Sequence, residues 1–181
     1  MSPADDPPSL RLSRRIDMIP AQGSACRARL KAEIAHGAVQ LALELELEGV
    51  ESLRDAHYAQ AIHLLDFGRS LIEGAEEARV IRQIEFGMAD GRPYGRSEIK
   101  LRLADRNDLT VPIEYEGGDT LAEAQRNLVS RIVGLGEAIV EAVDDEARDA
   151  FDHFGQNRDA LRQLTLGARW LHHAYNARSP W

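Results

Sequence analysis

The sequence predicts an α+β protein made of two tandem β-β-β-α pseudo-repeats, each an antiparallel meander with a covering helix, followed by a C-terminal helical extension. Two observations predict this fold class. Apolar and charged residues alternate over several stretches of about ten residues, which is the period of a half-buried strand. In addition, the strand-to-helix junction at residues 47–53 occurs again, 68 residues later, at residues 115–121.

The 181 residues divide into four expected parts. An acidic, proline-rich tail covers 1–9 and is expected to be disordered. The first unit covers 10–75, the second covers 76–143, and the helical extension covers 144–181.

Three strands are expected in the first unit, at 10–19, 26–35 and 39–48, with turns between them. Alanine, leucine, glutamate and lysine are strong helix formers, so a helix over 26–48 is the alternative. The strict two-residue period and the internal repeat favour strands. Ser52 is the expected N-cap of a helix whose buried stripe begins at Leu53 and which stops at Gly74.

The second unit repeats this order, with strands expected around 80–88, 99–103 and 111–115 and a long turn over 90–96. Thr120 and Glu123 form a capping box before the next helix. The extension is expected to hold a separate short helix over 144–154 and a third helix over 158–176.

Identical residues recur at the same offset of 68, among them the pairs Glu48/Glu116, Gly49/Gly117 and Gly68/Gly136. Coincidence between segments of similar composition is the alternative to duplication. We expect each helix to cover its own sheet and the two sheets to join edge to edge, with the opposite face polar and open. Gly134 and Gly136 lie inside a helical stripe, where small residues allow close packing.

Composition limits the classes of function. The net charge of −8 disfavours non-specific binding to nucleic acid, although it leaves a local basic surface open. Cys26 is the single cysteine, so no internal disulfide can form. The start of the sequence lacks the pattern of a signal peptide, and no apolar run reaches the length of a membrane span, so a cytoplasmic protein is expected.

Charge is segregated along the chain. Residues 10–38 carry +4 and residues 44–77 carry −7, so the first hairpin is basic and the third strand and helix are acidic. Pairing of opposite charges across strands is the favoured interpretation, with Lys100 and Arg102 expected beside Glu114 and Glu116. A partly cationic binding face is the alternative.

Two sets of residues are candidate binding residues. Arg92, Tyr94 and Arg96 surround an expected hairpin tip and combine the side-chain types that interfaces favour, with a plain polar loop as the alternative. Arg14 and Arg82 share the parity of the inward apolar residues. A charge in that position needs a partner. The favoured interpretation is a salt bridge within the chain, with Glu48 suggested for Arg14 and Glu116 for Arg82. The alternative is that the two arginines bind an anion.

Trp170 and Trp181 are the expected contacts to a partner. The sequence has no Gly-x-Ser-x-Gly nucleophile motif and no His-Glu-x-x-His zinc motif, and its six histidines are scattered. We therefore predict no catalytic residues, no metal site and no cofactor.

Three functions remain open. The first is a non-catalytic binding or assembly subunit that contacts protein partners or associates with itself. The second is a nucleic-acid-binding protein that uses the open sheet face and the basic hairpins, since tandem meander-plus-helix units resemble the layout of Whirly and Pur-type single-strand binders. The third is an enzyme or small-ligand protein with a site between the two units.

Overall fold

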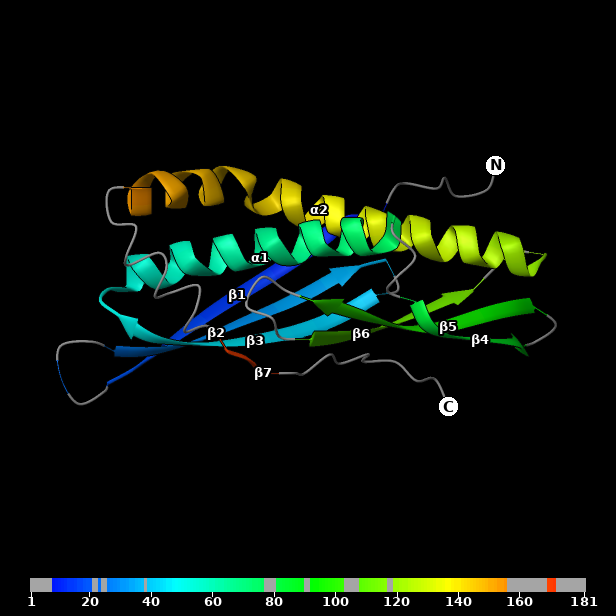
Figure 1. Ribbon diagram of the computed structural model, residues 1–181, viewed down its shortest axis with the longest axis horizontal. Helices are drawn as coiled ribbons and strands as arrows, with labels where there is room; N and C mark the ends of the chain where they lie inside the picture. Colours follow the sequence, from blue (N-terminus) through cyan, green and yellow to red (C-terminus); the bar gives the residue numbers. More distant parts are fainter. Residues whose placement is uncertain are drawn as a thin grey trace.

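The computed structural model describes residues 8–20, 23, 26–37, 39–76, 81–89, 92–102, 108–116, 119–155 and 169–171. Only the backbone is described for residues 75–76, for the strands between 81 and 116, for residues 169–171, and for Leu121, Ala124, Gln125 and Leu128. The described residues form two antiparallel sheets in one layer and two long helices in a second layer (Figure 1). The fold is therefore α+β, as the sequence predicts.

Up to the start of α2 the described elements follow the predicted order. The first meander comprises β1 (Leu10–Ile19), β2 (Cys26–His36) and β3 (Val39–Val50), and α1 (Leu53–Glu76) follows it. Next come β4 (Ile81–Ala89), β5 (Arg92–Arg102), β6 (Asp108–Glu116) and α2 (Leu121–Gly155), and a short strand, β7 (Arg169–Leu171), lies near the C-terminus. Residues 26–36 and 39–48 are thus in strands, and the helical alternative for them is wrong.

Alternation along β2 and β3 builds the core of the first sheet. Every second residue points toward the helices, and these side chains are buried: Ala28, Leu30, Ala32, Ile34, Val39, Leu41, Leu43, Leu45 and Leu47. The β2–β3 register sets Leu30 opposite Leu45 and Ala32 opposite Leu43, so apolar side chains meet across the strands. The residues between them carry the charges and point away from the helices.

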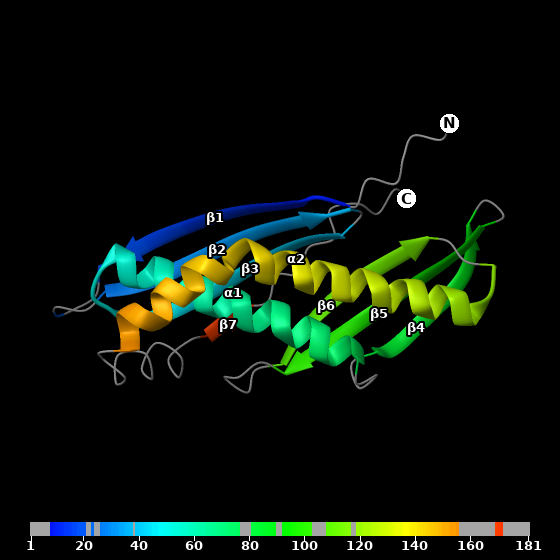
Figure 2. The same ribbon diagram turned by 90° about the horizontal axis from the view of Figure 1, so that it is seen from above.

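The two helices run antiparallel across the molecule (Figure 2). In Figure 1, α1 lies between α2 and the first sheet at one end, while α2 covers the second sheet at the other end. The helices touch at two glycines. A Cβ on Gly136 would lie 2.7 Å from the carbonyl oxygen of Gly68, and a Cβ on Gly68 would lie 3.0 Å from that of Gly136. The expected close packing at Gly136 is confirmed.

Both helix caps are also confirmed. The hydroxyl of Ser52 accepts the N–H of Asp55 at 3.1 Å, and that of Thr120 accepts the N–H of Glu123 at 3.2 Å. Leu53, however, is 52% exposed, so its expected place in the buried stripe is wrong. The first turn of α1 lies at the end of the molecule, and burial begins at Ala56 (Figure 2). The helix also passes through Gly74, where a stop was expected, and ends at Glu76.

Three expectations about the sheets are wrong. Within the described residues the sheets are separate, one ordered β1-β2-β3-β7 and the other β4-β5-β6. The outer edge of β3 pairs with β7 instead of β6, over Glu44 to Glu46. Residues 92–96 are not a hairpin tip, because β5 already begins at Arg92 and pairs with β4 there. In the resulting register Arg96 faces Glu114, while Lys100 faces Thr110, so the expected pairing of Lys100 and Arg102 with Glu114 and Glu116 is also wrong.

The C-terminal extension differs from the prediction as well. The helix expected over 144–154 is the continuation of α2, because Val143, Ala147 and Phe154 extend its buried stripe without a break. Asp144, Asp145 and Glu146 resemble a helix start in the sequence but lie inside this helix. The helix expected over 158–176 is wrong at residues 169–171, which form β7, and its other residues lie outside the described part of the chain.

Candidate functional site on the open face of the first sheet

The face of the first sheet that points away from the helices is lined by charged residues of β1, β2 and β3. Along β2 these are Arg27, Arg29, Lys31 and Glu33, and along β3 they are Glu44, Glu46 and Glu48. Because the core residues occupy the alternate positions, every charge on these two strands is placed on this face. We refer to it below as the open face.

Ion pairs neutralise the half of the open face that lies toward the β1–β2 turn. Arg27 contacts Glu46 at 3.4 Å and Glu48 at 3.3 Å, and Arg29 Nε lies 3.1 Å from Glu44 Oε1. The Arg29 contact is electrostatic only, since Nε makes no hydrogen bond in the described structure. The favoured sequence interpretation, cross-strand pairing of opposite charges, therefore holds for β2 and β3.

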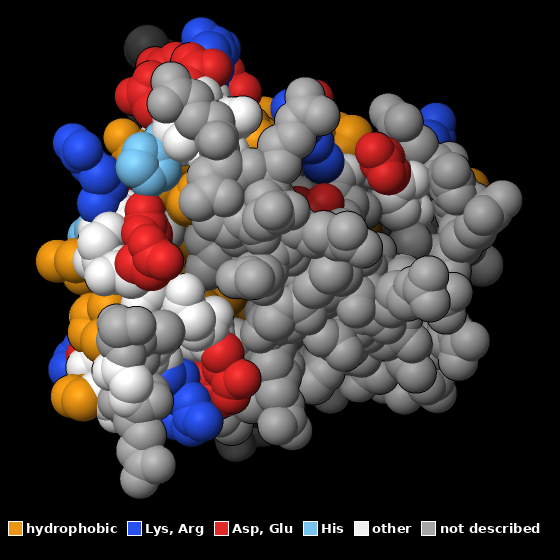
Figure 3. All heavy atoms as spheres, turned by 60° about the vertical axis from the view of Figure 1, so that its left-hand side comes forward, with side chains coloured by type: hydrophobic (Ala, Val, Ile, Leu, Met, Phe, Trp, Pro, Cys, Tyr) orange, Lys and Arg blue, Asp and Glu red, His pale blue; other side chains and the backbone are white. Residues whose placement is uncertain are grey.

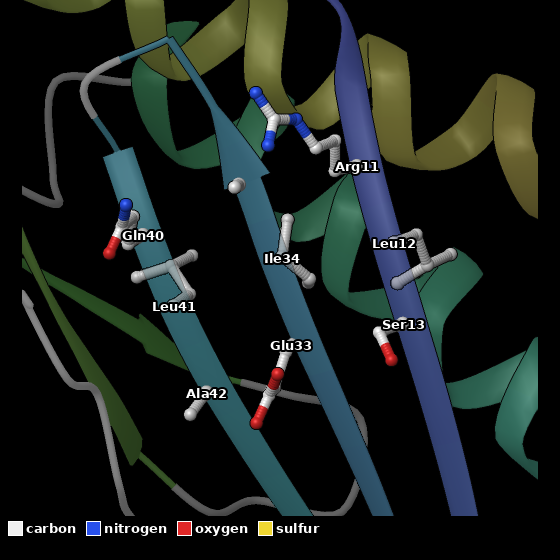
Figure 4. Close-up of a pocket in the computed structure, with 9 residues that line it drawn as sticks. Arg11, Leu12, Ser13, Glu33, Ile34, Gln40, Leu41 and Ala42 are labelled. Atoms are coloured by element: carbon white, nitrogen blue, oxygen red, sulfur yellow. The ribbon is translucent and has the colours of Figure 1, made fainter.

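A shallow depression of about 420 Å³ occupies the other half (Figure 4). Figure 4 looks onto the sheet with the helices behind it, and the depression crosses all three strands. Ala35 and Ala42 are among its lining residues, and their short side chains fill little of the space. Polar side chains from three strands surround them: Arg11 and Ser13 on β1, Glu33 on β2 and Gln40 on β3.

The charges at this depression are available for binding. Arg11 and Glu33 are exposed, and within the described residues neither forms a hydrogen bond or an ion pair. A cation, an anion, a hydroxyl and an amide therefore stand around a small apolar floor. This set can hydrogen-bond the backbone and polar side chains of a protein segment.

Arg14, a predicted binding residue, is bonded within the chain. Its guanidinium forms a bidentate pair with Glu146 of α2, with Nη2 at 3.0 Å from Oε1, and its Nε donates to Gln60 Oε1 of α1 at 2.9 Å. Nη2 also donates to the carbonyl oxygen of His57 at 3.3 Å. An intramolecular salt bridge is thus found, but the suggested partner is wrong because Glu48 pairs with Arg27.

The remaining predicted residues are placed only by their backbone. Arg82 lies in β4, Arg92, Tyr94 and Arg96 lie in β5, and Trp170 lies in β7 opposite Leu45. Trp181 lies outside the described residues. Arg92, Tyr94 and Arg96 share one strand parity, so their positions fall on one face of the second sheet. Within the described side chains, Arg14 and the depression stay apart because they belong to opposite faces of the first sheet.

A second polar cluster joins the start of α1 to the end of α2. His153 Nε2 lies 2.8 Å from Asp55 Oδ1, and the His153 ring packs against Tyr58 with a centroid distance of 5.0 Å. At the other end of the first sheet, His36 is partly buried beside Arg131. Burial and, to a smaller extent, the positive charge of Arg131 lower the pKa of His36, and a hydrogen bond to the backbone of Pro8 opposes them.

Sequence reasoning missed Glu146 and the residues around the depression. One signal was present for the Arg14 network: Gln60 interrupts the apolar stripe of α1, and a polar residue in that position needs a buried partner. Gln60 is 3% exposed and also donates to the carbonyl oxygen of Lys31 at 3.1 Å. The depression has no such signal, because it depends on which small side chains the strand register brings together.

No protein-family model, curated protein or solved structure matches this chain significantly. No helix in the described ranges is both long enough and apolar enough to cross a membrane. The described side chains include no group of three or more histidine, cysteine, aspartate or glutamate residues placed to hold a metal ion.

Proposed function

We propose that this protein is a non-catalytic binding or assembly subunit, cytoplasmic in location, that acts through protein–protein contacts made by the open face of the first sheet. One observation carries the proposal: both helices lie on one side of the sheets, and the other side of the first sheet is hollowed by a depression whose Arg11 and Glu33 have no partner among the described residues. A sheet with one packed face can present the other to a partner. The depression adds the local shape that a docked segment needs.

A site-specific photo-crosslinker tests this proposal. We would place a benzophenone amino acid at Gln40, which is exposed and lines the depression, and at Arg69, which is also exposed and lies on α1. Irradiation in cells of the source organism is expected to give a discrete higher-mass adduct from position 40 and none from position 69. Adducts from neither position, or the same adducts from both, would contradict the proposal.

Nucleic-acid binding is the alternative for the same face. It is less favoured, because Arg27 and Arg29 are neutralised by glutamates and only Arg11 and Lys31 remain as unpaired cations among the described residues of this face. Acidic side chains also gather at the top of the molecule, where α2 runs (Figure 3). Binding of a single-stranded oligonucleotide with a steep salt dependence would favour this alternative, and no binding at low salt would end it.

A small-ligand or enzyme site between the two units is the further alternative. The described helices meet there with their backbones close together at Gly68 and Gly136, so the contact point itself is filled. An open hollow of about 510 Å³ lies beside it and is lined by Ile72 and Val140 together with acidic residues of α2. Arg82, as the counterpart of Arg14, is the residue to test. An Arg82→Ala variant that keeps every ligand interaction would remove this alternative.

We also infer that the two β-β-β-α segments arose by duplication. The repeated element order supports this, and the helix crossing supports it further. Gly68 meets Gly136, Ile139 and Val140, while Gly136 meets Gly68, Leu71 and Ile72. When 68 is added to the residue numbers on α1, Gly68, Leu71 and Ile72 become Gly136, Ile139 and Val140. The offset found in the sequence therefore also relates the two sides of the helix crossing.

A further inference from the structure

The outer edge of β1 is free in the described structure. β1 pairs with β2 through ten consecutive residue pairs without a bulge, and no described strand lies on its other side (Figure 2). A long, regular edge of this kind exposes a row of unpaired N–H and C=O groups and can accept another strand. No proline interrupts β1 between Leu10 and Ile19.

The sequence of β1 is complementary to itself when it is read in the opposite direction about Arg14. Leu10 then stands opposite Met18, and Leu12 stands opposite Ile16, all on the inward face. On the open face Arg11 stands opposite Asp17. Apolar residues therefore face apolar residues, and an arginine faces an aspartate. Cross-strand pairs of both kinds stabilise antiparallel strands.

We propose that two copies of this chain associate through antiparallel pairing of their β1 strands, with Arg14 of each copy on the twofold axis. The partner that fits this edge is a second copy, because an isologous contact requires a self-complementary surface and β1 has one. The pairing uses the outer edge of β1, whereas the depression opens on the face of the sheet, and Arg11, Leu12 and Ser13 belong to both. The test of the dimer is separate from the test of the proposed function, because it measures association of the chain with itself.

Three features of the single chain fit this arrangement. Leu10, Leu12, Ile16 and Met18 are only partly buried in the monomer, and a strand added at this edge covers them further. Arg11 has no ion pair in the described part of the chain. Asp17 contacts Arg15 of its own chain through Oδ1 at 3.0 Å, and its carboxylate can also accept a hydrogen bond from Arg11 of the second copy. The two Arg14 guanidiniums would face each other, but each is already neutralised by Glu146 of its own chain.

Charge reversal tests the pairing. The full chain is expected to be a dimer by analytical ultracentrifugation. Arg11→Asp places a carboxylate opposite Asp17 twice per dimer and is expected to raise the dimer dissociation constant on the order of tenfold. Inside the chain the residue opposite Arg11 on β2 is Ala35, and Glu33 lies diagonally from Arg11, two positions along β2.

The double variant Arg11→Asp with Asp17→Arg restores opposite charges across the axis and is expected to recover most of the affinity. Arg54→Asp, a reversal at an exposed site on α1, is the matched control and should leave the dimer unchanged.

Asp17→Arg sets an arginine beside Arg29, so circular dichroism must first show that the variants are folded. If the double variant is not folded, the comparison of the dimer dissociation constants of Arg11→Asp and Arg54→Asp still tests the proposal. A monomer at every concentration, equal weakening by Arg11→Asp and Arg54→Asp, or a folded double variant no tighter than Arg11→Asp would overturn the proposal.

Discussion

At the scale of single residues, Arg14 shows how one charge can hold three elements together. It lies on β1, on the face that packs against the helices, and it bonds α1 through Gln60 and α2 through Glu146. The side chains of Arg14 and Glu146 are 19% and 33% exposed. An ion pair in such a half-buried place is worth more than a surface pair, because removal of one partner leaves the other poorly solvated.

Replacement of Arg14 by methionine is expected to lower the free energy of unfolding by about 1–3 kcal/mol, since Glu146 loses its ion-pair partner and Gln60 Oε1 loses its donor. Urea denaturation followed by circular dichroism measures the change. Arg15→Met is the matched control on the next residue, where the arginine side chain is 76% exposed. It should cost less than about 1 kcal/mol. Equal effects of the two variants would show that the Arg14 network contributes nothing beyond a surface pair.

His36 makes stability depend on pH. Its pKa in the folded protein lies below the ordinary histidine value of about 6.5 because burial disfavours the charged ring. Between the folded and unfolded pKa values the unfolded chain binds more protons, so stability rises with pH. The contribution of His36 is therefore complete above about pH 6.5 and is lost as the pH falls below that value.

A His36→Gln variant is expected to lose less stability than the wild type when the pH is lowered from about 7.5 to about 5.5, because its side chain does not titrate in this range. Urea unfolding of both proteins at both pH values gives the comparison. His57, which is exposed on α1, provides the matched substitution His57→Gln. The same pH slope in the wild type and in His36→Gln would count against the argument.

At the scale of elements, the crossing of α1 and α2 is set by the two glycines. Because neither has a side chain, the backbones approach closely, and Leu71, Ile72, Ile139 and Val140 pack around the contact point. The tight crossing also explains why glycine is tolerated in the middle of two long helices. Elsewhere in a helix, glycine costs about 1 kcal/mol relative to alanine.

Gly136→Ala is expected to destabilise the protein by about 1–3 kcal/mol, because the new methyl group would lie 2.8 Å from Ile72 and closer still to the backbone of Gly68. Gly134→Ala, two residues away in the same helix, has its nearest neighbour at 3.8 Å. It should be neutral or stabilise by up to about 1 kcal/mol. Thermal or urea unfolding gives both values, and a Gly136→Ala variant as stable as Gly134→Ala would refute the close crossing.

At the scale of the whole molecule, the first sheet and both helices share one core. α1 packs on the sheet, and the far half of α2 packs on α1 through a buried stripe: Ile132, Leu135, Ile139, Val143, Ala147 and Phe154. Two polar contacts hold the C-terminal end of α2 in place: His153 contacts Asp55 of α1, and Glu146 pairs with Arg14 of β1. The first β-β-β-α segment is therefore incomplete without a helix that follows the second meander.

A fragment of residues 1–78 is accordingly expected not to fold cooperatively, since the apolar upper side of α1 would be exposed to water. Thermal unfolding by circular dichroism and the dispersion of a proton NMR spectrum test this, with the full chain as the control. A cooperative transition and a dispersed spectrum from the fragment would show that the segment is an independent domain.

Much of the fold was accessible from the sequence. Period-two alternation located the strands of the first sheet, and Ser52 and Thr120 marked where the helices begin, because these signals depend on neighbouring residues alone. The same reasoning placed Arg92, Tyr94 and Arg96 in a turn, since proline and glycine there suggested one, while pairing with β4 already begins at Arg92.

The sequence by itself determined the α+β class, the strand and helix order through residue 121, the position of the caps and the need of Arg14 for an acidic partner. Only the tertiary structure decided which acid that partner is, that α2 continues to Gly155, that β3 pairs with β7, and that a depression opens at Ala35 and Ala42. The physical reason is the distance along the sequence between the residues that interact. Periodicity and capping are written in residues a few positions apart, whereas Glu146 lies 132 positions from Arg14 and becomes its neighbour only when α2 packs across α1.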